Sequence, residues 1–222
     1  HVVEIPSLYT AQCSITTDQD NNQITAFHPG AMGEAHQNKV ADAANISLGI
    51  VAPDGRDAML QHSRDFAALG IPFVFDPGQN LPLFSKDELL TCIDQTTWCV
   101  MNDYESQLMM KITELTLDDI ASQVDALIVT RGDEGSRIYA GGKSIDIPAA
   151  SIEAAVDPTG CGDAFRAGLL YGLNCGWDWE TSGRAASLVG AFKVERQGTQ
   201  NHHFTEDQFQ ARFEENFGYS LP

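Results

Sequence analysis

The chain has 222 residues, of which 43% are hydrophobic, so it can form one substantial domain with a sizeable core. Its formal net charge of −18, from 13 Lys and Arg against 31 Asp and Glu, repels phosphates and anionic lipids, so neither nucleic acid nor a membrane is an expected partner. Five scattered cysteines without a Cys-x-x-Cys pair fit a reducing, cytoplasmic location and argue against a zinc site.

The first predicted element is a β-hairpin. Residues 14–17 and 23–27 are rich in Thr, Ile and Gln, and Asp20-Asn21-Asn22 between them is typical turn chemistry. Residues 34–44 are predicted to form a short helix or a loop. Because the chain begins at His1, already inside what reads as a strand region, we expect a preceding N-terminal part to be missing.

Short apolar runs alternate with helical patterns from residue 47 onward. The runs predict buried strands over residues 47–52, 71–75, 97–101 and 126–130. The helical patterns predict helices over residues 56–69, 86–92, 103–111 and 117–124. A rim hairpin is expected over residues 136–147, followed by helices over residues 162–175, 179–195 and 206–217. Alternating strands and helices predict an α/β fold with a mostly parallel sheet covered on both faces.

The stretch of residues 157–165 carries the strongest chemical signal. Gly160 and Gly162 flank Cys161 just before a helical pattern, so three or four backbone N–H groups should point outward at a helix start and bind an anion. Asp163 would repel a phosphate, but it is suited to taking the proton of a hydroxyl nucleophile. An ordinary Asp favoured by the helix dipole is the alternative reading.

Two common nucleotide-binding signatures are absent from the sequence. There is no Gly-x-x-x-x-Gly-Lys-Ser/Thr loop, and position 165 is Phe where a dinucleotide fingerprint needs its third glycine. Neither a P-loop enzyme nor a Rossmann dehydrogenase is therefore indicated.

The string Asp-Pro-Thr-Gly-Cys-Gly-Asp-Ala-Phe-Arg-Ala-Gly, residues 157–168, resembles the C-terminal signature of the PfkB (ribokinase-like) family of carbohydrate and nucleoside kinases. The resemblance implies a three-layer α/β/α fold with a small β lid. Residues 9–32 would be part of the lid, and residues 33–222 the nucleotide-binding core, without the family's N-terminal segment.

The same resemblance assigns roles within the signature. It makes Asp163 the catalytic base, and the backbone of Gly160, Cys161 and Gly162 the anion hole for the γ-phosphate of ATP. Cys161 stands where the family mostly has Ala, Gly or Ser. Because the hole uses backbone N–H groups, a small thiol should be tolerated.

Asn102 and Glu105 follow a predicted strand and match the family's Asn-x-x-Glu motif. The resemblance implies that they organise Mg²⁺, largely through water, which agrees with the preference of this ion for oxygen ligands. The alternative is a helix N-cap by Asn102, with Glu105 completing a capping box.

Two glycine-containing segments resemble the family's nucleotide site. Thr130, Gly132 and Gly135 match a Thr-x-Gly-x-x-Gly segment, although a glycine-rich turn into the hairpin explains them equally well. Gly198 lies in a segment that borders the adenine pocket or a monovalent-cation site in many members, and its alternative role is a helix C-terminal glycine. The sequence also leaves open a K⁺ ion that faces backbone carbonyls near Asp157 and Thr159.

The expected acceptor follows from a resemblance to bacterial adenosine kinases within the family. Phe27 in the lid would stack on the purine, or else pack on its own domain. The expected reaction is ATP-dependent phosphorylation of the 5′-hydroxyl of adenosine, as in purine salvage. A ribose or fructose kinase and a non-catalytic nucleotide-binding fragment are the alternatives, and a homodimer through residues 9–32 is expected.

Overall fold

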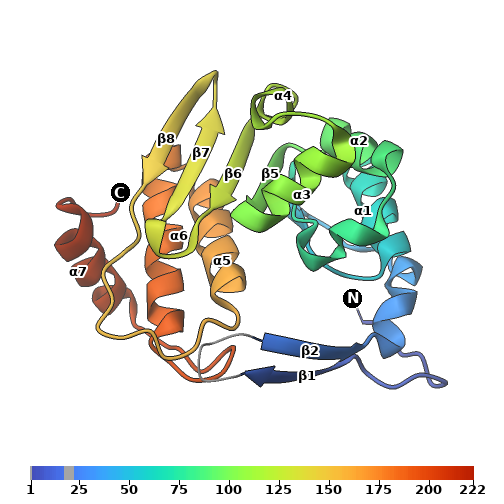
Figure 1. Cartoon of the computed structure of the whole chain (residues 1–222), viewed down its shortest axis with the longest axis horizontal. Helices are drawn as coiled ribbons and strands as arrows, with labels where there is room; N and C mark the ends of the chain where they lie inside the picture. Colours follow the sequence, from blue (N-terminus) through green and yellow to red (C-terminus); the bar gives the residue numbers. More distant parts are fainter. Residues whose placement is uncertain (1, 18–22) are drawn as a thin grey trace. The chain divides into compact units, whose positions relative to one another are not determined.

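The computed structural model describes residues 2–17 and 23–222. These residues form two compact units (Figure 1). Among the described residues, the first unit comprises residues 2–17, 23–99 and 107–124, and the second comprises residues 100–106 and 125–222. The expected turn at Asp20-Asn21-Asn22 lies outside the described residues. Among the residues that are described, no helix combines the length and the apolar character needed to cross a bilayer.

The first unit opens with the predicted hairpin. Strands β1 (Gln12–Thr17) and β2 (Gln23–His28) pair antiparallel, with Cys13 opposite Phe27. Two 3-10 helices follow, over Gly30–Gln37 and Val40–Asp42, in the stretch for which the sequence left helix and loop open. The hairpin prediction is confirmed.

The rest of the first unit is built from parallel strands and helices. Its elements are β3 (Gly49–Val51), α1 (Arg56–Leu69), β4 (Phe73–Phe75), a 3-10 helix (Gly78–Leu83), α2 (Lys86–Gln95), the start of β5 (Trp98–Asn102), most of α3 (Asp103–Thr113) and α4 (Leu117–Ala121). β3 pairs parallel with β4, and β4 with β5. All three residues of β4 are buried, as expected for a strand covered on both faces.

The second unit contains the end of β5, the rim hairpin and the C-terminal helices. Its elements are β6 (Ala126–Thr130), a 3-10 helix (Gly132–Glu134), β7 (Ser136–Ala140), β8 (Lys143–Ile147), α5 (Cys161–Cys175), α6 (Trp179–Val194) and α7 (Glu206–Phe217). β6, β7 and β8 pair antiparallel. The strand order in the sheet is β3-β4-β5-β6-β7-β8, so the predicted α/β class is confirmed.

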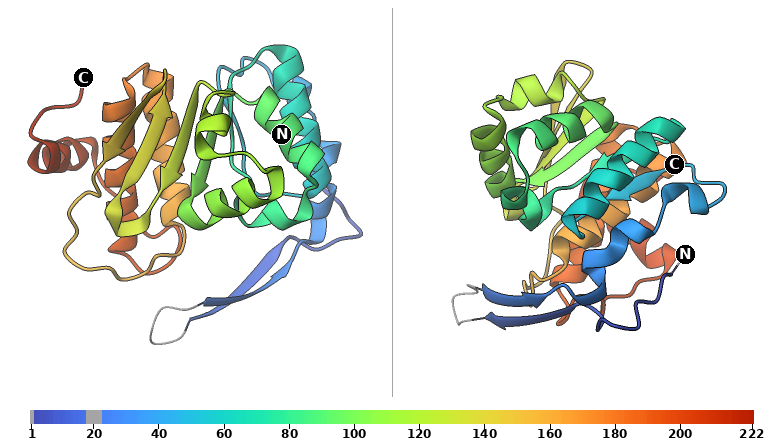
Figure 2. Two further views of the ribbon diagram at one scale, coloured as in Figure 1. Left: turned by 45° about the horizontal axis from the view of Figure 1, so that its top comes forward. Right: turned by 90° about the vertical axis from the view of Figure 1, so that its right-hand side faces the viewer.

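Close packing against α6 fixes the position of α5 within the second unit. A Cβ at Gly168 of α5 would lie 2.7 Å from the Ala186 Cα of α6, and one at Gly172 would lie 2.6 Å from the Ser182 Oγ. Gly183 of α6 approaches the isoleucines of β7 and β8 in the same way. α5 and α6 therefore lie side by side behind these strands (Figure 2). Small residues at these contacts let the backbones approach closely.

Candidate active site

The predicted anion site lies at the start of α5. Gly160 is the N-cap residue with φ +86°, and its carbonyl accepts from the amide of Ala164 at 3.0 Å. The Cys161 amide donates to the Pro158 carbonyl at 3.1 Å and so closes the turn. In the part of the chain that the structure describes, the amides of Gly160, Gly162 and Asp163 meet no protein acceptor. These three donors are therefore available to an anion.

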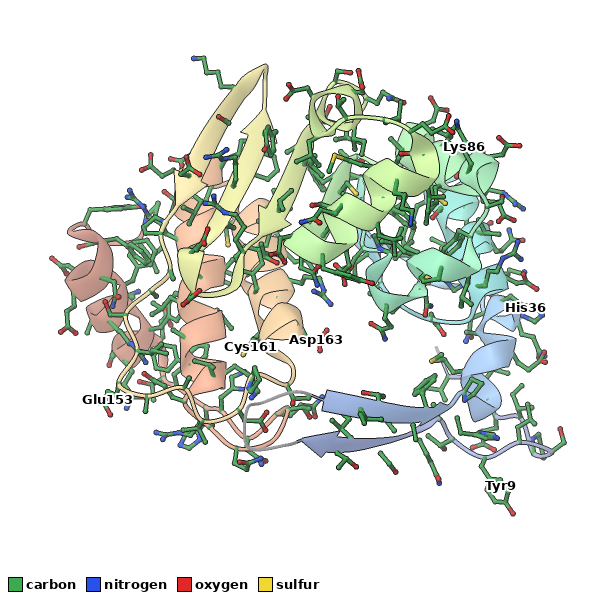
Figure 3. All side chains as sticks on the ribbon, viewed as in Figure 1. Tyr9, His36, Lys86, Glu153, Cys161 and Asp163 are labelled. Atoms are coloured by element: carbon green, nitrogen blue, oxygen red, sulfur yellow. The ribbon has the colours of Figure 1, made fainter. Side chains whose placement is uncertain are left out.

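Asp163 stands in the first turn of α5, beside those amides (Figure 3). Its side chain is 79% exposed, and its Oδ1 accepts from Arg166 Nη2 at 3.2 Å. The geometry thus presents an accessible carboxyl group next to a cluster of N–H donors, which suits a general base for a hydroxyl group.

The Cys161 thiol does not add negative charge to the site. Burial is the largest cause that raises its pKa, while the positive charge of Lys193 opposes that shift. The thiol therefore stays protonated near neutral pH, and its Sγ lies 3.9 Å from the Asp157 carbonyl oxygen. This agrees with the expectation that a small thiol is tolerated here.

The Asp157 carboxylate holds the loop before α5 to a distant segment. Its Oδ1 accepts from the Thr159 amide at 2.9 Å, and its Oδ2 accepts from the Gly198 amide at 2.8 Å and from Gln197 Nε2 at 3.0 Å. The hydrogen bond from the Thr159 amide is the largest cause that lowers the Asp157 pKa to about 2. Gly198, with φ +83°, is therefore a structural partner of the loop.

We expect Asp157→Asn to lower stability at pH 7, because an amide cannot accept three hydrogen bonds as a carboxylate does. The folded pKa of about 2 lies below the ordinary aspartate pKa of 3.8, so the unfolded chain binds the proton more readily. The Asp157 carboxylate therefore contributes to stability at pH values above its unfolded pKa. This contribution is lost as the pH falls through its folded pKa. The urea midpoints of Asp157→Asn and of the wild type should therefore differ at pH 7 and converge near pH 2. The exposed Asp133→Asn is the control; a constant difference at every pH would contradict the prediction.

Lys193 was not identified from the sequence, but it lies directly behind this loop. Its side chain is fully buried, and Nζ donates to the Asp157 carbonyl at 2.7 Å and to the Arg196 carbonyl at 3.2 Å. A single lysine inside the otherwise apolar run of residues 188–194 was the available signal. Lysine is almost never fully buried unless it is paired.

Asn102 and Glu105 form a reciprocal pair at the end of β5. The Asn102 amide donates to Glu105 Oε2 at 2.8 Å, and the Glu105 amide donates to Asn102 Oδ1 at 2.7 Å. This is the capping-box alternative, and it fixes both side chains. Because each oxygen keeps a further lone pair, capping does not prevent either side chain from binding water around a metal ion.

The glycine-rich turn after β6 has a clear structural purpose. Gly135 has φ +84°, and a Cβ there would lie 2.1 Å from the Ile147 carbonyl oxygen. Gly132 has φ +59° with open space around it, and Thr130 ends β6. Arg131 binds Asp146 through Nη2 at 3.0 Å, which agrees with an ordinary turn arginine. Contacts of this turn with a nucleotide stay a prediction.

Phe27 is the predicted site residue outside the second unit. Phe27 lies on β2 in the first unit and is 51% exposed, whereas every other candidate residue belongs to the second unit.

A groove of about 930 Å³ in the second unit is lined by the 151–156 segment, the end of α6 and α7. None of the candidate site residues lines it, so the groove is separate from the α5 site.

The comparison with family models decides the family. A model of the pfkB family of carbohydrate kinases matches residues 1–206. The chain belongs to this family. Membership of the pfkB family confirms a phosphotransferase of the carbohydrate and nucleoside kinase type.

Curated nucleoside kinases are similar to this pfkB-family chain over most of its length. The enzyme of Methanocaldococcus jannaschii is 38% identical over 208 residues, which cover 93% of this chain and 68% of the relative. The enzyme of Methanothermobacter thermautotrophicus is 32% identical over 216 residues, which cover 96% of this chain and 69% of the relative. The chain thus spans about two thirds of their length.

Solved structures give the same result. The nucleoside kinase of Burkholderia thailandensis in complex with inosine is 51% identical with a TM-score of 0.95, over 97% of this chain and 71% of that one. The ribokinase of Thermotoga maritima, 20% identical over 93% of this chain and 70% of that one, has a TM-score of 0.75 and bears on the fold alone. The predicted ribokinase-like fold is therefore confirmed for this pfkB-family chain.

Proposed function

We propose that this chain transfers the γ-phosphoryl group of ATP to the 5′-hydroxyl of a purine nucleoside, with adenosine as the main acceptor. The observation that carries the proposal is the exposed Asp163 carboxylate beside the amides of Gly160 and Gly162 at the start of α5. The Burkholderia nucleoside kinase structures in complex with inosine and with ADP-inosine support a nucleoside acceptor and an adenine nucleotide donor. Phe27 would stack on the purine base.

The proposed chemistry needs one proton transfer and one displacement. Asp163 takes the proton of the acceptor hydroxyl as the hydroxyl oxygen forms its bond to the γ-phosphorus. The bond from the γ-phosphorus to the β–γ bridging oxygen breaks, and ADP leaves with that electron pair. The amides of Gly160, Gly162 and Asp163 bind the transferring phosphoryl group and stabilise its charge. Thr130, Gly132 and Gly135 would contact the nucleotide.

Mg²⁺ fits the residues present at the end of β5. The pair formed by Asn102 and Glu105 offers fixed amide and carboxylate oxygens, which this ion prefers, and the ion retains several waters. Within the described residues there is no group of three or more His, Cys, Asp or Glu side chains that could hold a metal, so phosphate oxygens and water would complete its shell. When bound, the ion would neutralise charge on the phosphates.

The acceptor is tested by ADP release with Mg-ATP and adenosine, inosine, ribose or fructose. We expect adenosine and inosine to support turnover and the free sugars to support little. Turnover with ribose or fructose alone would keep the chemistry but overturn the acceptor; the ribokinase of Bacillus subtilis, 34% identical over 60% of this chain and 41% of its own length, is the relative behind this alternative. ATP binding without turnover on any acceptor would favour a non-catalytic module.

The hairpin also supports a proposed homodimer through residues 9–32. Ile15 on β1 is 40% exposed, and Ile24 and Phe27 on β2 are 78% and 51% exposed in the single chain, so both hairpin strands carry uncovered apolar area. Sedimentation equilibrium at micromolar concentration should show a dimer, and Ile24→Asp should shift it toward monomer. A wild-type chain that sediments only as monomer would remove this proposal.

A further inference from the structure

The Lys193 ammonium joins the two segments that make the anion site. One acceptor is the carbonyl of Asp157, at the start of the loop that carries Gly160. The other is the carbonyl of Arg196, next to the segment in which Gly198 binds the Asp157 carboxylate. The buried amine thus lies beneath the backbone whose N–H groups bind the phosphoryl group.

Burying the Lys193 ammonium is energetically unfavourable. Removing an ammonium from water costs several kcal/mol, and backbone carbonyls offset only part of that cost. The charge of Lys193 acts on both Asp157 and Cys161, where it favours the ionised forms of their side chains. The positive potential therefore reaches the loop that would receive a phosphate, where a fixed cation stabilises added negative charge.

K⁺ does not fit beside the Asp157 carbonyl in this structure. The carbonyl oxygen that would face the ion already accepts from Lys193 Nζ at 2.7 Å, and Cys161 Sγ lies 3.9 Å from the same oxygen. A second monovalent cation there would meet the like charge of the ammonium at close range in a poorly solvated place. An ammonium and K⁺ carry the same charge and favour the same carbonyl ligands, so one can replace the other.

We propose that Lys193 is a positioning residue whose tethered ammonium takes the place of a monovalent cation behind the anion hole, so that this kinase works without added K⁺. This inference rests on the proposed phosphoryl transfer. Lys193 touches neither substrate nor the reacting atoms; it fixes the loop and supplies positive potential through the carbonyls of Asp157 and Arg196.

The test compares wild type, Lys193→Met and Lys193→Gln in a choline chloride buffer and in the same buffer with KCl or NH₄Cl. Gln keeps an N–H donor for the carbonyls but has no charge, whereas Met keeps only the length. We expect wild-type kcat to change less than about twofold with K⁺. Both variants should lose on the order of tenfold or more in kcat without K⁺, as when one charge-stabilising group is removed. K⁺ or NH₄⁺ should restore part of this loss, and Li⁺ should not.

These measurements test the role of Lys193 separately from the proposed kinase activity. Wild-type activity that needs K⁺ would overturn the inference, as would a folded Lys193→Gln that matches wild type in choline buffer. Calorimetric Kd values for ATP in the same buffers give a readout without turnover: the variants should bind ATP more weakly, and K⁺ should restore binding. If no acceptor gives turnover with any variant, the kinase proposal fails, and the cation dependence of ATP binding still decides the role of Lys193.

Discussion

Asp163→Asn should lower kcat for adenosine phosphorylation by about a hundredfold or more, since positioned proton transfer contributes on that scale. The amide keeps the size of the side chain and the first-turn position in α5 but cannot take a proton. ATP should bind as well as before or more tightly, because a negative charge beside the phosphates is removed. Steady-state kinetics together with calorimetric Kd values for ATP separate the two effects.

A matched variant distinguishes catalysis from helix stabilisation. Asp207 is also an exposed acid in the first turn of a helix, α7, and it lies outside the candidate site. If the carboxylates act only through the helix dipole, Asp163→Asn and Asp207→Asn should both cost a few tenths to 1 kcal/mol of stability and leave kcat alone. Wild-type kcat in a folded Asp163→Asn would therefore remove Asp163 as the base.

Gly135→Ala should destabilise the chain by on the order of 3 kcal/mol, from an unfavourable backbone conformation and a backbone clash. The residue has φ +84° and ψ −132°, and the new Cβ would lie 2.1 Å from the Ile147 carbonyl oxygen and 2.7 Å from the Ala149 nitrogen. Backbone atoms cannot move aside as a flexible side chain would. Thermal or urea unfolding of the two proteins measures the loss.

Gly132→Ala is the control in the same turn. Its φ of +59° is also left-handed, but no atom lies within 4 Å of the added Cβ. The expected loss is about 1 kcal/mol, from the backbone conformation alone. Equal losses at both positions would contradict the clash argument. A rise in the ATP Kd of the folded Gly132→Ala would support a nucleotide contact at this turn.

Several elements could be predicted because their signals are local. The buried strand Phe73–Phe75 reads as a continuous apolar run, and Gly70 with φ +64° ends α1 where the sequence indicated. The start of α5 follows from Gly160 and Gly162 in the same way. The reciprocal bonds of Asn102 and Glu105 were also foreseen as an alternative, since they join residues three positions apart.

The hydrogen bond of the Cys161 amide could not be predicted from the sequence. The sequence placed Cys161 in the anion hole together with its glycine neighbours, but the Cys161 amide donates to the Pro158 carbonyl at 3.1 Å. The turn that orients the loop uses this donor, which leaves the amides of Gly160, Gly162 and Asp163 for an anion. Which N–H groups a loop exposes depends on its exact backbone angles, and a pattern of glycines does not specify them.

The sequence by itself determined the α/β class, the order of the elements and the position of the glycine-rich loop with Asp163, because these depend on residue types a few positions apart. Only the tertiary structure decided what supports that loop. Lys193 binds the carbonyl of Asp157 across 36 positions, and the Gly198 amide binds its carboxylate across 41. Such contacts depend on how α5 and α6 pack through Gly168 and Gly172, and no local propensity encodes that packing.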